Sequence, residues 1–113
     1  PYFMQRLFVY GSLMPTGQNN NILKKFNGNW QKAFIYGDLK IIKIKNMEYF
    51  AVNLKSQIKK RIFGYLFSSY LLNYLWSTLD EFEGTNYRRV KTKVFTNNYK
   101  KIDAYVYELN LNE

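Results

Sequence analysis

Glu83 is the residue of this chain whose position points most directly to chemistry. It lies in a segment from Ser69 to Gly84 whose apolar residues have the i, i+3, i+4, i+7 spacing of a helix that buries one face: Leu72, Leu75, Trp76, Leu79 and Phe82. Ser68 or Ser69 can cap the start of this helix, and Gly84 stands where a C-terminal glycine is expected. The spacing therefore predicts one amphipathic helix that ends at Glu83.

A carboxyl group that faces a core at the end of a helix has a raised pKa. At about 100° per residue, Glu83 falls on the apolar stripe, whereas Glu81 projects from the opposite face and Asp80 lies near the border. Glu83 loses hydration there, and the negative end of the helix dipole opposes its charge. A pKa near neutrality suits a general acid/base, so Glu83 is the candidate catalytic residue. The alternative is that the last turn frays and Glu83 faces solvent.

The turn Tyr10-Gly11-Ser12-Leu13 is the candidate binding element. It follows an apolar run over residues 6–10 that predicts a fully buried strand. A glycine at the end of a strand lets consecutive backbone N–H groups point outward, and such a nest binds a carboxylate or a developing oxyanion. As a nucleophile Ser12 would need a lysine as its base, because the chain has no histidine. We therefore expect Tyr10, Gly11, Ser12 and Leu13 to bind substrate; a plain strand-to-loop turn is the alternative.

The absence of cysteine and histidine narrows the chemistry further. It excludes disulfides, thiol nucleophiles, a Ser-His-Asp relay and zinc sites built on these residues, so we expect no metal and no cofactor. The 113 residues suffice for a single domain, residues 1–113, with its own core. No apolar run approaches the roughly 18 residues of a membrane span, and the start lacks a signal-peptide pattern. We therefore expect a cytoplasmic protein without a membrane partner.

The net charge of +9, from 17 Lys and Arg against 8 Asp and Glu, raises the question of a nucleic-acid partner. The basic residues are spread along the chain, and several alternate with Val90, Thr92 and Val94, as on a solvated sheet face. We therefore expect the charge to solvate the general surface. Clustering of Tyr and Lys on one exposed face would instead favour nucleic acid.

The remaining pattern predicts an α+β domain whose sheet curls into a small barrel, with the Glu83 helix packed on it. Asn19, Asn20 and Asn21 cap a short helix, Gly37 marks a bulge or a close backbone approach, and Asn46 marks a turn. A hairpin that turns at Asn97-Asn98 has one wet face, which carries Tyr105 and Tyr107. The predicted strands cover residues 6–10, 30–44, 49–52, 61–67 (fully buried), 90–94 and 102–107.

Five segments, in this order, resemble the motifs of one family. They are Tyr10-Gly11-Ser12-Leu13 with Gly17 and Asn20; Gly64-Tyr65-Leu66-Phe67; Leu79-Asp80-Glu81-Phe82-Glu83-Gly84, an L-D-x-x-E-G pattern; Tyr87-Arg88-Arg89, a Y-x-R pattern; and Ala104-Tyr105-Val106-Tyr107. Together they are similar to the γ-glutamylcyclotransferase-like family, which includes the γ-glutamylamine cyclotransferases and the AIG2-like proteins. The resemblance covers essentially the whole chain.

The resemblance implies a mixed five- or six-stranded β-barrel with flanking helices and a pocket for a γ-glutamyl group. It implies an enzyme that cyclises this group to 5-oxoproline and releases an amine or amino acid. The backbone amides of the Tyr10–Leu13 turn would bind the group, and Glu83 would be the acid/base. Two departures affect substrate choice: Tyr49-Phe50-Ala51 replaces a Tyr-Pro-Ala-like turn, and Met14 replaces an arginine that many relatives carry after the Tyr10–Leu13 turn.

Two other classes of protein fit the same residues. One is a small-molecule-binding protein of the same fold without turnover, and the other is a basic nucleic-acid-associated protein whose aromatic side chains stack on bases. Because Glu83 and the Tyr10–Leu13 turn are both present, we favour the enzyme, as a monomer or a weak homodimer acting on a small molecule.

Overall fold

The computed structural model describes residues 3–11, 14, 17 and 21–111. The Ser12 and Leu13 predictions therefore fall outside the described residues, as does the capping role of Asn19 and Asn20. The described elements are β1 (Gln5–Val9), α1 (Asn21–Lys24), β2 (Asn29–Ile44), β3 (Met47–Asn53), β4 (Lys60–Ser69), the 3₁₀ helix η1 (Tyr70–Tyr74), α2 (Trp76–Glu83), β5 (Tyr87–Thr96) and β6 (Lys101–Leu109).

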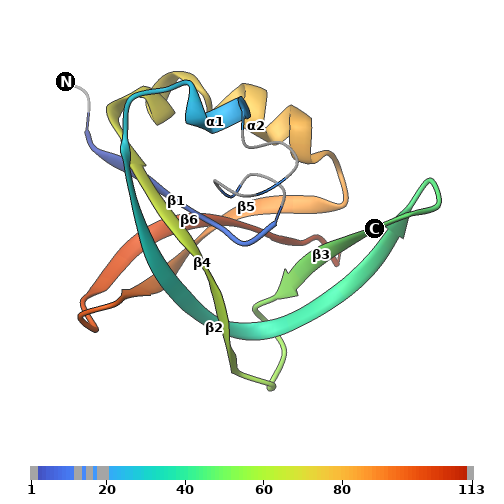
Figure 1. Ribbon diagram of the computed structural model, residues 1–113. Helices are drawn as coiled ribbons and strands as arrows, with labels where there is room; N and C mark the ends of the chain where they lie inside the picture. The colour runs from blue at the N-terminus through green and yellow to red at the C-terminus, as the bar shows by residue number, and fades with distance from the viewer. Residues whose placement is uncertain (1–2, 12–13, 15–16, 18–20, 112–113) are drawn as a thin grey trace.

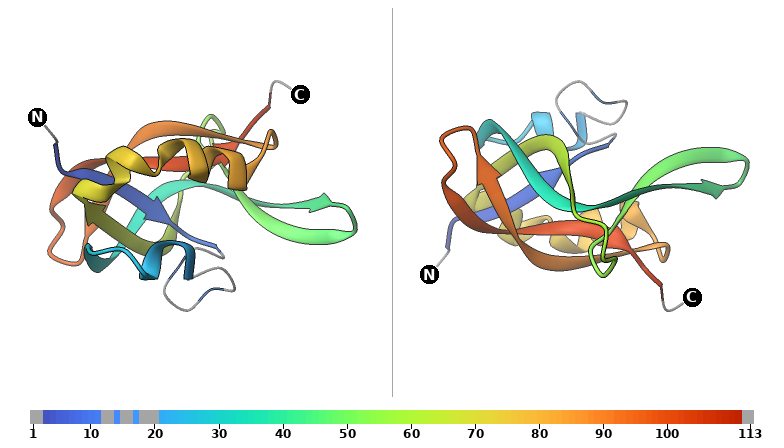
Figure 2. Two further views of the ribbon diagram at one scale, coloured as in Figure 1. Left: turned by 90° about the horizontal axis from the view of Figure 1, so that it is seen from above. Right: turned by 90° about the horizontal axis from the view of Figure 1, so that it is seen from below.

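The six described strands form one mixed sheet in the order β1-β4-β2-β3-β6-β5. The sheet closes on itself because β1 also pairs with β6, and β5 also pairs with β2. Most pairings are antiparallel, but β6 runs parallel to both β1 and β3. Figure 1 shows the helices gathered on one side of this ring, and Figure 2 shows the far part of the β2–β3 hairpin extending away from it. The predicted α+β architecture is thus confirmed as a closed ring of strands with few helices.

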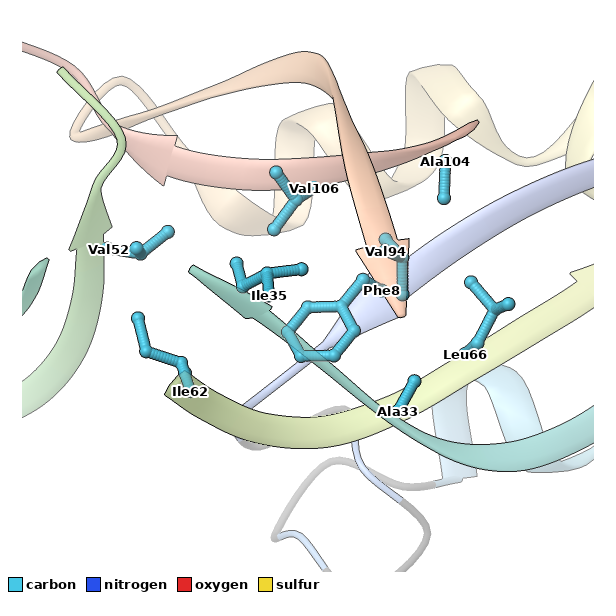
Figure 3. Close-up of a cluster of buried hydrophobic side chains, with 9 residues drawn as sticks. All are labelled: Phe8, Ala33, Ile35, Val52, Ile62, Leu66, Val94, Ala104 and Val106. Carbon is cyan, nitrogen blue, oxygen red and sulfur yellow. The ribbon is translucent and has the colours of Figure 1, made fainter. Parts of the chain in front are cut away.

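The inside of the ring is filled by alternate residues of every strand, as the period of two in a strand requires. Figure 3 shows these side chains pointing toward one another: Phe8, Ala33, Ile35, Val52, Ile62, Leu66, Val94, Ala104 and Val106. Strand β1 lies against β4 so closely that a Cβ on Gly64 would be 2.1 Å from the carbonyl oxygen of Val9. This contact fixes the end of β1, where the predicted binding turn begins.

A second core lies between the outer face of the ring and the helices. Its buried members are Leu7, Val9, Leu23, Phe67, Leu72, Leu79 and Tyr107. Leu7 and Val9 face this core while Phe8 faces the interior, which confirms that residues 7–9 are buried on both sides. The prediction that Tyr105 and Tyr107 lie on a wet face was wrong, since Tyr107 is only 5% exposed. The alternation in the hairpin does not reveal that another element covers the second face.

The predicted helix over residues 69–84 is divided into η1 and α2. Ser69 caps the first piece by accepting a hydrogen bond from the Leu71 N–H at 3.0 Å, and Leu75 separates the two, its N–H donating to the carbonyl of Leu72. Gly84 ends α2 with φ +80°, as predicted for a C-terminal glycine. Phe82 is 41% exposed, so its placement in the apolar stripe was wrong. A 3₁₀ helix has about 3.0 residues per turn, whereas the prediction used about 100° per residue for the whole segment. The predicted face of residues in α2 is therefore rotated away from the observed one.

The outer face of β2, β4 and β5 carries an exposed aromatic cluster. Rings of Tyr36, Phe63, Phe95 and Tyr99 surround Phe34, and the guanidinium of Arg61 lies 4.8 Å from the centre of the Phe34 ring. Phe63 is 68% exposed, so the prediction of a fully buried strand over residues 61–67 was wrong. Its residues alternate instead between the ring interior and this surface.

Two smaller predictions are confirmed. The β2–β3 hairpin turns at Lys45 and Asn46, both with positive φ. Gly37 is a site of close approach, because a Cβ there would be 2.7 Å from the Cγ2 atom of Val52. Within the described ranges, every helix is too short or too polar to cross a membrane.

Candidate active site

Glu83 is the last residue of α2 and is half-buried. Burial disfavours its charged form and raises the pKa of Glu83 to about 7, from an ordinary value of 4.5. Glu81, two residues earlier, is exposed, as the helical periodicity predicted. The fully frayed alternative, with Glu83 in open solvent, does not describe this structure. At neutral pH the Glu83 carboxyl is therefore divided between its protonated and charged forms.

Three tyrosines lie close enough to Glu83 to feel its charge: Tyr10, Tyr87 and Tyr107. Burial is the main reason that the pKa of each phenol is raised, and it brings the pKa of Tyr87 to about 12 with a smaller contribution from the Glu83 charge. Each phenol therefore stays protonated near pH 7. The carboxyl at the end of α2 thus sits among side chains from β5, β6 and the residue after β1.

Tyr10 reaches across the end of the ring. Its hydroxyl donates a hydrogen bond of 2.6 Å to the backbone carbonyl of Tyr107, and it accepts one of 3.1 Å from the N–H of Val52. These two bonds join the end of β1 to β6 and to β3. The Tyr10 hydroxyl thus has both its hydrogen-bond partners within the protein. These two bonds hold in place the residue that precedes Gly11.

The backbone carbonyl of Gly11 accepts a hydrogen bond of 3.0 Å from the N–H of Met14. Gly11 has no positive φ, and a Cβ there would meet no described protein atom within 4 Å. Neither backbone strain nor crowding therefore requires glycine at this position, contrary to the conformational argument made from the sequence. Among the described residues, none fills the space that a side chain at this position would occupy. The role of the Ser12 and Leu13 N–H groups stays a prediction.

Asp80, Arg89 and Tyr107 form a network that the sequence reasoning did not find. Arg89 donates to both carboxylate oxygens of Asp80, from Nε at 2.9 Å and from Nη2 at 3.2 Å, and the Tyr107 hydroxyl donates to Oδ1 at 2.7 Å. The Arg89 guanidinium also lies over the rings of Trp76 and Tyr105, at 4.4 and 5.0 Å. Asp80 is the aspartate of the L-D-x-x-E-G pattern, and Arg89 is the arginine of the Y-x-R pattern. Membership of these two patterns was the only sign in the sequence that the two residues belong to the site.

Tyr87 connects the same region to the segment Tyr49-Phe50-Ala51. Its hydroxyl donates to the backbone carbonyl of Phe50 at 2.6 Å. The family resemblance leads us to expect a Tyr-Pro-Ala-like turn at this segment. The contact uses only a backbone carbonyl oxygen, which proline also supplies. The departure at Phe50 therefore leaves this contact in place and changes the neighbouring side chain.

A cleft of about 650 Å³ lies beside the end of α2. Asp80, Tyr87, Arg89 and Tyr107 are among the residues that border it, but Glu83 is not. The cleft is large enough for a small molecule, since such sites span roughly 300–1,000 Å³. Because Glu83, the candidate acid/base, does not border this cleft, the cleft is not assigned to the reacting group. In the part of the chain that the structure describes, the acidic side chains form no cluster able to hold a metal ion.

The sequence profile of the family described as gamma-glutamyl cyclotransferase, AIG2-like, matches residues 7–113. The chain belongs to this family. Family membership supports a cyclotransferase-like function in general terms. No curated protein matches the sequence.

Solved structures of low sequence identity share the fold. YkqA from Bacillus subtilis has 22% identity and a TM-score of 0.72, over 96% of this chain and 36% of YkqA. An AIG2-like protein from Mus musculus has 15% identity and a TM-score of 0.72, over 99% of this chain and 81% of that protein. A structure named gamma-glutamyl cyclotransferase has 17% identity and a TM-score of 0.64, over 96% of this chain and 68% of that protein. The present chain thus spans little more than a third of YkqA.

Family motifs that are far apart in the sequence meet around the end of α2. Tyr10 comes from the first motif, Glu83 from L-D-x-x-E-G, Tyr87 from Y-x-R and Tyr107 from the closing strand. The charge of Glu83 acts on all three phenols. Of the five predicted site residues, Glu83 and the phenol of Tyr10 thus lie close enough to interact electrostatically. The position of the substrate relative to Gly11 stays a prediction.

Proposed function

We propose that this chain is a γ-glutamyl cyclotransferase that converts a γ-glutamyl compound to 5-oxoproline and a free amine or amino acid, with Glu83 as its general acid/base. The observation that carries the proposal is the half-buried Glu83 carboxyl, whose pKa is raised to about 7 and whose charge acts on the phenol of Tyr10, the residue before Gly11. A group with this pKa accepts and returns a proton with little cost at neutral pH.

The reaction needs no nucleophile from the enzyme, because the substrate carries its own. The α-amine of the γ-glutamyl group attacks the γ-carbonyl carbon, a new C–N bond closes the five-membered ring, and the C–N bond to the leaving amine breaks. The α-ammonium nitrogen loses two protons, one before the attack and one as the ring closes, and the ring nitrogen of 5-oxoproline keeps the third. Glu83 takes these protons in turn and returns them to the departing nitrogen, which leaves as an ammonium group. General acid/base catalysis of this kind contributes about 10²–10⁴-fold, and holding the amine in attack geometry contributes on a similar scale or more.

The turn after β1 would hold the γ-glutamyl group. The surroundings of Gly11 support this, because a ligand can approach its backbone without meeting any side chain of the described residues. Backbone N–H groups of Gly11, Ser12 and Leu13 would fix the group and stabilise negative charge on the γ-carbonyl oxygen, worth about 10²–10³-fold for each good donor. Tyr10 would contribute by holding the turn in place.

The same proposal includes the setting in which the enzyme works. We propose one domain over residues 1–113, a monomer or weak homodimer in the cytoplasm, with a small γ-glutamyl molecule as its partner and no cofactor. Tyr49-Phe50-Ala51 would shape the wall beside Tyr87 and so influence which leaving amine is accepted.

The experiment that tests the function measures 5-oxoproline released by the wild-type protein and by Glu83→Gln. The substrates are γ-glutamyl amino acids, γ-glutamyl-ε-lysine, other γ-glutamyl amines and glutathione. Release from at least one substrate by the wild type, and not by the variant, would support the proposal. Saturable binding of a γ-glutamyl compound without any release would assign the chain to the non-catalytic binding proteins of this fold.

A further inference from the structure

We propose that Asp80, Arg89 and Tyr107 are positioning residues that hold Glu83 in register with the Gly11 turn. This inference rests on the proposed function, because it explains how the acid/base and the binding turn are kept together. The three side chains exchange no proton with the substrate in this scheme. They act through α2, which carries Glu83, and through Tyr10, which leads into the turn.

The first link joins α2 to the sheet. Asp80 lies almost one helical turn before Glu83, and Arg89 on β5 holds its carboxylate with two hydrogen bonds of 2.9 and 3.2 Å. A bidentate pair of this kind fixes direction as well as distance. The same guanidinium stacks 4.4 Å from the Trp76 ring, so one arginine holds both the beginning and the middle of the helix.

The second link joins α2 to the turn. Tyr107 donates its hydroxyl to Asp80 at 2.7 Å, and its backbone carbonyl accepts the Tyr10 hydroxyl at 2.6 Å. Tyr10 is bonded to Gly11 through the chain. A continuous path therefore runs from the helix that carries Glu83 to the turn that would hold the substrate, and Tyr107 is the residue that joins its two halves.

The helix α2 is short, and little of its apolar surface is fully buried. It is eight residues long, Leu79 is its buried residue, and Phe82 is largely exposed. A misplacement of about 1 Å at a reacting group can cost about 10²-fold in rate. The orientation of Glu83 therefore depends on the polar network in addition to the apolar contact of Leu79.

The test uses Tyr107→Phe, which keeps the ring and the backbone carbonyl and removes only the hydroxyl. Two readouts are measured on the full chain: steady-state kinetics, and the pKa of the Glu83 carboxyl by carbon-detected NMR. We expect kcat to fall by about 10-fold to 10²-fold with KM changed less, because the substrate turn stays in place. We also expect the pKa of Glu83 to fall from about 7 toward 4.5, because a looser helix end lets water reach the carboxyl.

The direction of the pKa change separates positioning from simple electrostatics. The charge of Glu83 acts on Tyr10, Tyr87 and Tyr107. The other titratable or charged groups around this end of the helix include Asp80 and Glu81 on α2, Arg89 on β5, Glu108 on β6 and Tyr49 on β3. Loss of the Tyr107 hydroxyl leaves the Asp80 charge less compensated, which would raise the pKa of Glu83. A fall in this pKa therefore supports positioning, whereas a rise or no change would overturn it.

Tyr105→Phe is the matched control, because it makes the same chemical change two residues earlier on the same face of β6. Tyr105 contacts Arg89 and Trp76 through its ring, which phenylalanine keeps, and we expect at most a twofold change in kcat. Asp80→Asn provides a second variant that breaks the charged pair with Arg89. If the wild type proves inactive, the NMR readout still tests the positioning role, so failure of the function and failure of this inference give different results.

Discussion

The hydroxyl of Tyr10 donates a hydrogen bond of 2.6 Å to the backbone carbonyl of Tyr107, 97 residues further along the chain. This bond joins the residue after β1 to β6, close to the end of α2 that carries Glu83. The first and last strands thus build the two sides of the candidate site, and α2 supplies its carboxyl. Both sides therefore depend on the closure of the ring.

Glu83→Gln is expected to abolish turnover and to leave folding and substrate binding intact. Glutamine keeps the shape of the side chain but cannot carry the proton, so kcat should fall by about 10²–10⁴-fold. Steady-state release of 5-oxoproline, with calorimetric titration of substrate, measures both effects. Glu81→Gln, on the exposed face of the same helix, is the control and should change the rate little. A Glu83→Gln rate above about one hundredth of the wild-type rate would exclude Glu83 as the base.

The pKa of Glu83 predicts a specific dependence of stability on pH. Its folded-state pKa of about 7 lies above the unfolded value of 4.5, so the neutral form is favoured by folding. The contribution of Glu83 to the free energy of unfolding is complete below the unfolded pKa of 4.5, and it is lost as the pH rises through about 7. From about pH 4 to about pH 8.5 the wild type should lose on the order of 1–3 kcal/mol relative to Glu83→Gln, the range being reduced for partial exposure.

Urea unfolding of both proteins at the two pH values checks this difference. Other carboxyl groups titrate equally in both, so their effects cancel in the comparison. Parallel stability curves for the wild type and Glu83→Gln would show that the carboxyl has an ordinary pKa.

Two glycines next to the site are expected to respond in opposite ways to alanine. Gly64→Ala places a Cβ 2.1 Å from the Val9 carbonyl oxygen, so it should destabilise the fold by several kcal/mol, at least about 3. Gly11→Ala meets no described protein atom within 4 Å and has no positive φ, so its stability should stay within about 1 kcal/mol of the wild type.

The functional effect of Gly11→Ala should nevertheless be large. A methyl group would occupy the space through which a γ-glutamyl group approaches the backbone, and we expect KM to rise at least about tenfold. Thermal unfolding and substrate titration of the two variants measure these outcomes. A Gly11→Ala protein with wild-type KM would move the substrate away from this turn.

The sequence predicted that Glu83 faces the core, and the structure shows it half-buried, so the direction of the prediction was right and its extent was not. The direction could be predicted because the signal is local. Leu79 and Gly84 belong to the same short helix or adjoin it, so periodicity and the end of the helix both place the carboxyl. The division at Leu75 and the exposure of Phe82 were not predictable, because they depend on how η1 and α2 pack on the ring. The strand pattern predicted a curled sheet, and the family resemblance added a barrel of five or six strands. The order of the strands was not predicted, since alternation alone gives strands without their order.

The network around Asp80 was missed for a different reason. Its partners come from β5 and β6, nine and 27 residues away, and only the register of these strands brings them under α2. Tyr107 had been placed on a wet face because nothing in the alternation of its hairpin shows what covers it. Tyr10 was predicted to bind substrate, and this stays a prediction. The hydrogen bonds of its hydroxyl to Tyr107 and Val52 could not be predicted, because they depend on which strands pair.

The last prediction is that the net charge of +9 marks no dedicated nucleic-acid site. Basic residues are scattered over the chain, and some lysines are paired with acids, as Lys40 is with Asp38 and Lys93 with Asp103. The exposed rings around Phe34 are nevertheless the place where bases would stack if nucleic acid were bound. A protein this basic will bind DNA or RNA at low salt whatever its function, so detection of binding alone decides nothing.

Salt dependence and a surface variant distinguish the two cases. Non-specific contacts to phosphates should fade between about 50 and about 200 mM salt, with little preference for sequence or strandedness. The double variant Phe63→Ser, Tyr99→Ser removes the two most exposed rings of the cluster and should leave this weak binding unchanged. Fluorescence anisotropy with single-stranded and double-stranded probes measures both. Sub-micromolar binding that survives physiological salt and is lost in the double variant would show that the aromatic cluster is a nucleic-acid surface, because stacking on exposed rings is the part of such binding that salt does not screen.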